Sequence, residues 1–131
     1  MSTNDPIRIL IADDNKAVRD VLALIIEAEP DLTVAGIARD GREAVRLCQQ
    51  FQPDVALLDL GMPHLRGDEA TLQIRAAGLP TRIVLFSNAD PVGLRNAARH
   101  CQPDAVLRKE TLKEIVTVIR GLVAAPPPNR E

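Results

Sequence analysis

Several polar residues follow apolar runs of this sequence at points where they could bind a metal ion and a phosphate. Asp13 and Asp14 follow one run, Asp59 follows another, and Ser87 and Lys109 follow two later ones. If three carboxylates were grouped together, they would repel one another, and their ionised forms would need a cation beside them. Mg²⁺ is a suitable cation, because it prefers hard oxygen ligands.

The same residues could carry out phosphoryl transfer. A metal ion held by a few carboxylates keeps coordination positions that a phosphate oxygen can occupy. Lys109 would offer a positive charge to a second phosphate oxygen, and Ser87 would offer a hydroxyl to a third. A carboxylate such as Asp59 could then act as the nucleophile and form an aspartyl phosphate. This chemistry needs positioning and charge neutralisation rather than a general base, because a carboxylate is already ionised.

Five short apolar segments, mostly of Leu and β-branched residues, predict buried parallel strands. Their apolar character is continuous, so we expect helices to cover both faces of the sheet that they form. The predicted strands are Ile7–Ala12, Leu32–Ala38, Val55–Leu58, Ile83–Phe86 and Ala105–Leu107.

The segments between and after these strands have the apolar periodicity of amphipathic helices. The third predicted helix runs from about residue 68 to residue 77. The fourth should start with Asp90 as its N-cap and Pro91 at the first helical position. The fifth should start with a capping box formed by Thr111 and Glu114.

This alternation of strands and helices predicts an α/β fold, a doubly wound parallel sheet of the flavodoxin-like order 2-1-3-4-5. In that order the first and third strands are neighbours. Ligands of such sheets bind beyond the carboxyl ends of the strands. We therefore expect Asp13, Asp14 and Asp59 to share one crevice. The predicted domain covers residues 1–125, and residues 126–131 form a proline-rich tail or the start of a linker.

Composition excludes several classes of function. The net charge is −2, and the two aromatic residues, Phe51 and Phe86, argue against a surface that binds nucleic acid. No apolar run reaches the roughly 20 residues that a membrane helix needs. The polar residues 1–6 do not form a secretory signal, so we expect a cytoplasmic protein. Cys48 and Cys101 lack metal-ligand spacing and should be buried free thiols.

These motifs resemble the receiver domains of bacterial two-component response regulators over residues 7–124. The stretch 30–44 is most similar to the subgroup whose receivers precede a LuxR-type helix-turn-helix domain. The residues that carry the resemblance are the pair Asp13-Asp14, the motif Asp59-Leu60-Gly61-Met62-Pro63 followed by Gly67, Ser87 and Lys109.

The resemblance implies a role for each site residue. Asp59 would accept a phosphoryl group from a histidine kinase. Asp14 and Asp59 would bind Mg²⁺ directly, together with the backbone carbonyl of Gly61, whereas Asp13 would act mainly through a water molecule. Lys109 would pair with the phosphoryl group.

The resemblance also implies a switch. Ser87 would move toward the phosphoryl group and remodel the surface of the fourth helix, the fifth strand and the fifth helix, as a population shift between two states. The domain would not be a dedicated enzyme, apart from self-dephosphorylation. It would regulate transcription through a DNA-binding output domain that is absent from this chain. The receiver itself would not contact nucleic acid. Whether it forms a homodimer is left open.

Three positions depart from the family pattern. Val106 stands where members usually have an aromatic residue that swings inward on activation, which puts the coupling step in question. Asn88 stands where a small residue is common, and could hinder phosphate donors or hydrogen-bond the phosphate. Glu110 stands where proline is common, so no cis bond is expected there, and its carboxylate could compete for Lys109.

Two alternatives remain at this stage. The first is a pseudo-receiver that docks proteins without phosphorylation, suggested by Val106 and Asn88. The second is a phosphatase of the haloacid-dehalogenase type, which would need a second Asp two residues after the nucleophile, where this chain has Gly61. His64 and His100 are not expected to bind metal or to relay phosphoryl groups.

Overall fold

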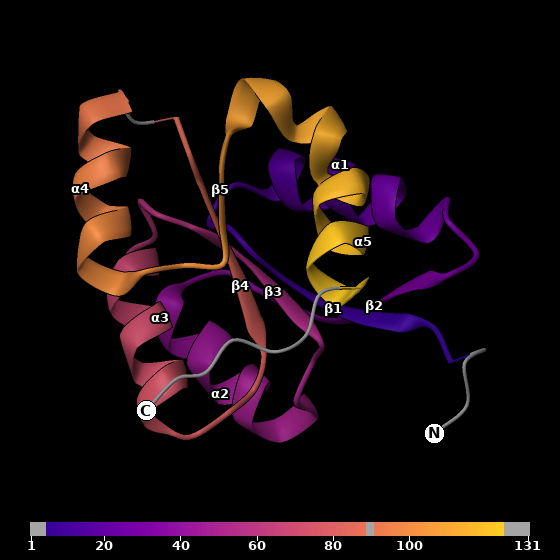
Figure 1. Ribbon diagram of the computed structural model, residues 1–131, viewed down its shortest axis with the longest axis horizontal. Helices are drawn as coiled ribbons and strands as arrows, with labels where there is room; N and C mark the ends of the chain where they lie inside the picture. The colour runs from indigo at the N-terminus through magenta and orange to yellow at the C-terminus, as the bar shows by residue number, and fades with distance from the viewer. Residues whose placement is uncertain (1–4, 89–90, 125–131) are drawn as a thin grey trace.

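The protein is described by a computed structural model that places residues 5–88 and 91–124. In these residues five parallel strands form one sheet in the order β2-β1-β3-β4-β5 (Figure 1). The predicted flavodoxin-like topology is therefore confirmed. The strands are β1 (Ile7–Ala12), β2 (Leu32–Ala38), β3 (Val55–Asp59), β4 (Arg82–Ser87) and β5 (Ala105–Arg108).

Helices cover the two faces of the sheet in separate layers (Figure 1). On one face lie α1 (Lys16–Glu27) and α5 (Ile115–Ala124). On the other face lie α2 (Gly41–Phe51), α3 (Gly67–Ala76) and α4 (Pro91–Cys101).

Each strand divides its side chains between two hydrophobic clusters. Ile9 and Ile11 of β1 join the cluster under α1 and α5. Leu10 and Ala12 point the other way and join the cluster under α2, α3 and α4. This alternation is what the pleat of a strand requires when both faces are covered, and it explains the continuous apolar runs.

The predicted boundaries differ from the structure by a residue or two at functional positions. Asp59 and Ser87 are the last residues of β3 and β4 rather than the first residues beyond them. Helix α3 begins at Gly67 and ends at Ala76. Pro91 begins α4 as predicted, whereas Asp90, its predicted N-cap, lies outside the described residues.

The prediction for the start of the last helix is wrong. A 3₁₀ segment, η1 (Lys109–Glu114), follows β5, and the regular helix α5 begins only at Ile115. The hydroxyl of Thr111 donates a 2.9 Å hydrogen bond to the carbonyl of Arg108. Thr111 therefore closes the turn that follows β5 instead of capping α5. Short 3₁₀ segments are common connectors of this kind.

Both cysteines are free and buried, as predicted. Burial raises the pKa of the Cys48 thiol to about 12, so this thiol is inert at neutral pH. Over the part of the chain that the structure describes, no helix combines the length and the apolar character needed to cross a membrane. The predicted tail at residues 126–131 lies outside that part.

Candidate functional site

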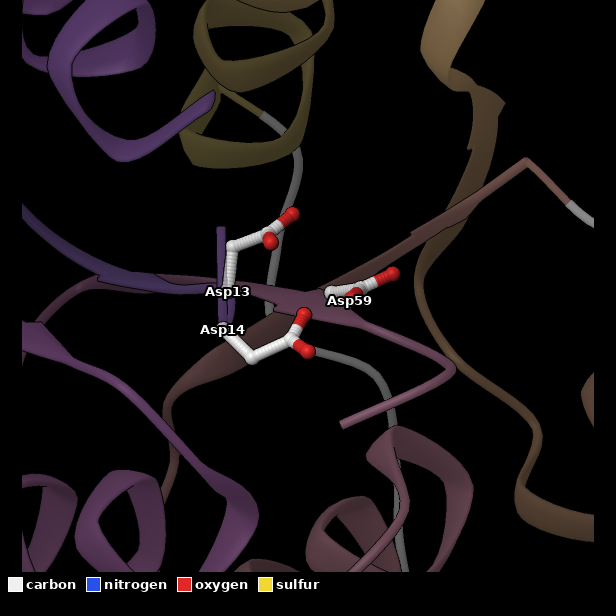
Figure 2. A group of neighbouring side chains, drawn as sticks. All are labelled: Asp13, Asp14 and Asp59. Atoms are coloured by element: carbon white, nitrogen blue, oxygen red, sulfur yellow. The ribbon is translucent and has the colours of Figure 1, made fainter. Parts of the chain in front are cut away.

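Three aspartates meet at the carboxyl ends of two neighbouring strands. Asp13 and Asp14 directly follow β1, and Asp59 ends β3, with Ala12 and Leu58 paired in register just before them. One carboxylate oxygen from each aspartate lies within 4.8 Å of the other two. Figure 2 shows the three side chains projecting from these strand ends into a common space.

The three carboxylates differ in their exposure to solvent. Asp13 is fully buried and Asp59 is 4% exposed, whereas Asp14 is exposed. The cluster therefore combines two desolvated charges with one that solvent reaches. A ligand approaching from solution would meet Asp14 at the rim and Asp59 behind it.

Local hydrogen bonds hold the acidic turn that follows β1. The backbone N–H of Asn15 donates to Asp13 Oδ1 at 2.8 Å, and Arg19 donates to the Asp13 carbonyl at 3.0 Å. The N–H of Asp13 donates to the carbonyl of Ala38 at the end of β2. Asn15 is also the N-cap of α1, because its side chain accepts a bond from Val18. The turn is thus fixed by the start of the helix that follows it.

Lys109 brings a positive charge into this cluster. Its Nζ lies 2.8 Å from Asp13 Oδ2 and 3.4 Å from Asp59 Oδ1. The lysine side chain is 13% exposed, and its Nζ also lies 5.5 Å from the centroid of the Phe86 ring. One ammonium group therefore faces three carboxylates, and a negative charge of about two remains to be balanced.

The charge imbalance appears in the pKa values of the site. Burial, together with the charge of Asp13, raises the pKa of Asp59 to about 6, although Lys109 opposes this rise. Burial acts to lower the pKa of Lys109, but the hydrogen bond with Asp13 and the charge of Asp59 outweigh it and raise that pKa. Lys109 is therefore charged at neutral pH, and Asp59 is mostly ionised but destabilised.

These residues fit a divalent cation. The donors are all carboxylate oxygens, which suit Mg²⁺, and a divalent ion would balance the residual charge. Asp13 Oδ2 is buried, and apart from its 2.8 Å contact with Lys109 Nζ it has no hydrogen-bond partner within the described residues. That oxygen therefore keeps a lone pair for a cation or for its bound water.

The loop after Asp59 is held close to the strand end. The N–H of Leu60 donates to the carbonyl of Phe86 at 2.9 Å, and the N–H of Gly67 donates to the carbonyl of Leu60 at 3.0 Å. The N–H of Gly61 points at Asp59 Oδ1, 3.5 Å away. The backbone on both sides of the phosphoacceptor candidate is thereby anchored.

Two glycines permit this close approach. A Cβ on Gly67 would lie 2.9 Å from the carbonyl carbon of Asp59 and closer still to its oxygen. A Cβ on Gly41 would lie 2.7 Å from the carbonyl carbon of Leu65, in the loop between β3 and α3. The sequence singles out Gly67 only as part of the receiver motif and indicates no packing role for Gly41. Their packing roles depend on contacts that the sequence does not display.

The predicted switch residues lie on β4, just beyond it and on β5, in different environments. Ser87 is 5% exposed at the end of β4, in register with Arg108. Asn88 is exposed beyond it. Val106 is 44% exposed on the edge strand β5 and pairs in register with Leu85, which places it on the sheet face covered by α2, α3 and α4.

Glu110, whose carboxylate could have competed for Lys109, does not pair with it. It pairs instead with Arg108 at 3.0 Å, and its side chain is 63% exposed. The described residues contain no cis peptide bond, in agreement with the prediction for this position. His64 lies in the exposed loop between β3 and α3, and His100 is exposed near the end of α4. Neither belongs to the acidic cluster.

Comparison with known proteins defines the class of this protein. The family model of the response regulator receiver domain matches residues 9–120. The chain therefore belongs to the receiver domain family of two-component response regulators. Receiver domains bind Mg²⁺ at an acidic pocket, and this chain has a cluster of three aspartates that could hold a metal ion.

Several relatives are similar to this chain in sequence. It is 39% identical over 122 residues to the transcriptional regulatory protein LiaR of Bacillus subtilis, covering 92% of this chain and 58% of LiaR. It is 46% identical over 84 residues to a protein-glutamate methylesterase/protein-glutamine glutaminase of Myxococcus xanthus, covering 64% of this chain and 24% of that protein. The chain thus spans only a part of the curated relatives that it matches.

Solved structures agree with this family. The response regulator domain of Thermotoga maritima CheB superimposes with a TM-score of 0.83 at 31% identity, covering 93% of this chain and 99% of that one. A DNA-binding response regulator of the LuxR family from Staphylococcus aureus superimposes with a TM-score of 0.82 at 25% identity, covering 88% and 97%. Similarity thus extends both to receivers of transcription regulators and to the receiver of an enzyme.

Proposed function

We propose that Asp59 accepts a phosphoryl group from a histidine kinase, with Mg²⁺ bound beside it. One observation carries this proposal. Asp59 ends a buried strand with a carboxylate whose pKa is raised to about 6, and its neighbours are two further aspartates and the ammonium of Lys109. Such a carboxylate is ionised at neutral pH but lacks full charge compensation, so it gains from binding a metal ion and a phosphorus centre.

The residues that would hold Mg²⁺ are Asp14 and Asp59 directly, the backbone carbonyl of Gly61, and Asp13 through a water molecule. When bound, the ion would neutralise negative charge on the transferring phosphoryl group. The exposed position of Asp14 supports an entry path for the ion from solution.

In the proposed transfer, a carboxylate oxygen of Asp59 attacks phosphorus. The bond from phosphorus to the donor imidazole nitrogen breaks, and its electron pair stays on that nitrogen. Lys109 pairs with one phosphoryl oxygen, and the Ser87 hydroxyl donates to another. No proton is removed from the nucleophile, since Asp59 is already ionised.

We propose further that phosphorylation changes the surface formed by α4, β5 and α5. Ser87 ends β4, which pairs with β5. A movement of the Ser87 side chain would therefore change the packing around Val106 on β5. The relationship to LiaR, a transcriptional regulatory protein, supports an output domain that binds DNA. The proposed place of action is the cytoplasm, together with the kinase.

Intact mass after incubation with Mg²⁺ and acetyl phosphate tests the proposal. We expect the gain of one phosphoryl group, abolished by excess chelator and by Asp59→Asn. Asp54→Asn is the matched control, because Asp54 precedes β3 at the opposite edge of the sheet and should leave the gain intact.

The absence of a mass gain would be followed by a binding test with beryllofluoride, which mimics the phosphoryl group. If neither the mass gain nor beryllofluoride binding occurs, the phosphoacceptor role is excluded and a protein-docking pseudo-receiver takes its place. If both occur, hydrogen exchange across α4 and β5 measures whether the surface responds despite Val106.

A further inference from the structure

We propose that Phe86 is a positioning residue, whose ring holds the ammonium group of Lys109 inside the acidic cluster. The inference deepens the proposed function and rests on it, because Lys109 is the group that would meet the phosphoryl oxygens. Phe86 itself would touch neither the metal ion nor the phosphoryl group.

Phe86 occupies a position from which it can act on the site. It is the penultimate residue of β4 and pairs in register with Asp59 on β3. Its carbonyl accepts the N–H of Leu60, the residue after Asp59. Its ring is fully buried in the cluster under α1 and α5. Both its ring and its backbone are therefore held in place.

The geometry places the lysine charge over this ring. Lys109 Nζ lies 5.5 Å from the ring centroid, within the roughly 6 Å over which a cation is attracted by the electron-rich face of an aromatic ring. The same Nζ lies 2.8 Å from Asp13 and 3.4 Å from Asp59. Its side chain is largely desolvated, and desolvation strengthens a cation–π contact.

The ring contact differs in kind from the two ion pairs. The ion pair with Asp59 depends on a charge that phosphorylation changes, whereas the attraction to Phe86 does not. Lysine has a long and flexible stem, so ordering its ammonium at the moment of transfer would cost conformational entropy. The ring of Phe86 lowers that cost by retaining Lys109 in the cluster before and after Asp59 reacts.

Fluorination of the ring tests the proposal with little change of shape. We would place 4-fluorophenylalanine and 3,5-difluorophenylalanine at position 86, because fluorine withdraws electron density from the ring face. With Mg²⁺ present, beryllofluoride affinity should fall stepwise, by about two- to fivefold in total, as a partial loss of a cation–π contact predicts. The same substitutions at Phe51, the other phenylalanine of the chain, should leave the affinity unchanged.

A second measurement needs neither metal nor phosphate. The unfolding equilibrium constant of the metal-free protein should rise by a similar factor on fluorination at position 86. In a Lys109→Met background that effect should disappear, which a purely structural role of the ring would not produce. Equal effects in both backgrounds, or unchanged beryllofluoride affinity, would overturn the inference. If the unmodified protein binds no beryllofluoride, the proposed function fails, and the metal-free cycle still decides whether Phe86 acts on Lys109.

Discussion

Two groups of three aspartates, one at each edge of the sheet, differ in how well their negative charges are compensated. Asp13, Asp14 and Asp59 lie at the carboxyl ends of the strands and share the charge of Lys109. At the amino edge, one aspartate directly precedes each of β2, β3 and β5. Those three are Asp31, Asp54 and Asp104.

Each aspartate of the amino edge has partners of its own. Asp31 pairs with Arg120 at 2.8 Å. Asp54 Oδ2 accepts the backbone N–H of Arg8 at 2.8 Å. Asp104 Oδ2 accepts the N–H of Ile83 at 2.7 Å and pairs with Arg75 at 3.2 Å. The carboxylates here tie helices and strands together.

Two connections at this edge are built in the same way. Gln52-Pro53-Asp54 leads from α2 into β3, and Gln102-Pro103-Asp104 leads from α4 into β5, each with its Gln in the left-handed region. An arginine donates to the last carbonyls of each helix. Arg8 reaches those of Phe51 and Gln52, and Arg75 reaches those of Cys101 and Gln102. These bonds satisfy carbonyls that a helix end leaves without partners.

The comparison teaches that residue type alone does not identify a functional carboxylate. At the amino edge the aspartates are compensated, so they stabilise the fold. At the carboxyl edge two buried aspartates and one exposed one face a single lysine, so the fold retains a charge imbalance that a ligand can relieve. Stored destabilisation of this kind is typical of functional sites.

The largest expected effect comes from crowding the carboxyl edge. Gly67→Ala should lower the free energy of unfolding by about 3 kcal/mol, because its Cβ would overlap the backbone of Asp59. Urea unfolding measures the change. The control is Gly61→Ala, whose Cβ would meet nothing within 4 Å. Equal losses in the two variants would show that the close packing at Asp59 is not the cause.

Breaking the amino edge should have the next largest effect. Asp104→Ala removes the acceptor of Ile83 N–H and leaves the mostly buried Arg75 without this partner. We expect a loss of about 2–3 kcal/mol in the free energy of unfolding. Asp104→Asn, which keeps an acceptor oxygen, should recover part of that loss. If Asp104→Ala left the free energy of unfolding unchanged, the aspartates of the amino edge would not be the stabilising group that the comparison makes them.

Removing one of the uncompensated negative charges at the carboxyl edge should stabilise the protein. A carboxyl group whose folded-state pKa is raised from 3.8 to about 6 disfavours folding above pH 6, and this penalty vanishes as the pH falls below 4. Asp59→Asn should therefore raise the free energy of unfolding of the metal-free protein by about 1–3 kcal/mol at pH 7.5. The gain should fade between pH 6 and pH 4. Asp54→Asn should give no such gain, and a pH-independent gain for Asp59→Asn would contradict the argument.

The smallest effect is expected for the exposed pair of the amino edge. Arg120 lowers the pKa of Asp31 through a side-chain hydrogen bond, but both groups are solvent-exposed. Arg120→Ala should therefore shift the melting temperature less than Gly67→Ala, Asp104→Ala or Asp59→Asn does. The shift should become smaller still at high salt. If the shift were as large as that of Asp104→Ala, solvent exposure would not explain a difference between the stability contributions of Asp31 and Asp104.

The sequence by itself determined the architecture and the membership of the acidic cluster. Apolar runs of strand length alternating with helical periods allow few topologies, and the order 2-1-3-4-5 brings the ends of β1 and β3 together. Polar residues placed at those ends must then converge. Asp13, Asp14, Asp59 and Lys109 could be predicted as neighbours because that inference uses only local patterns and the rules of parallel sheets.

Only the tertiary structure decided which charged side chains form ion pairs with one another. Lys109 pairs with Asp13 and Asp59 rather than being drawn to the adjacent Glu110, which pairs with Arg108. The Gln-Pro-Asp repeat is visible in the sequence, but its arginine partners are not, because Arg8 lies 44 residues from Gln52 and Arg75 lies 27 from Gln102.

The start of α5 and the roles of two glycines were also decided in three dimensions. The pattern at Thr111 favours a capping box, but its hydroxyl instead donates a hydrogen bond to the carbonyl of Arg108 in the turn after β5. Gly41 and Gly67 are required by backbones that approach from other elements. Local propensity and periodicity describe a segment on its own, whereas these features depend on the space that its neighbours leave and on the charges that they bring.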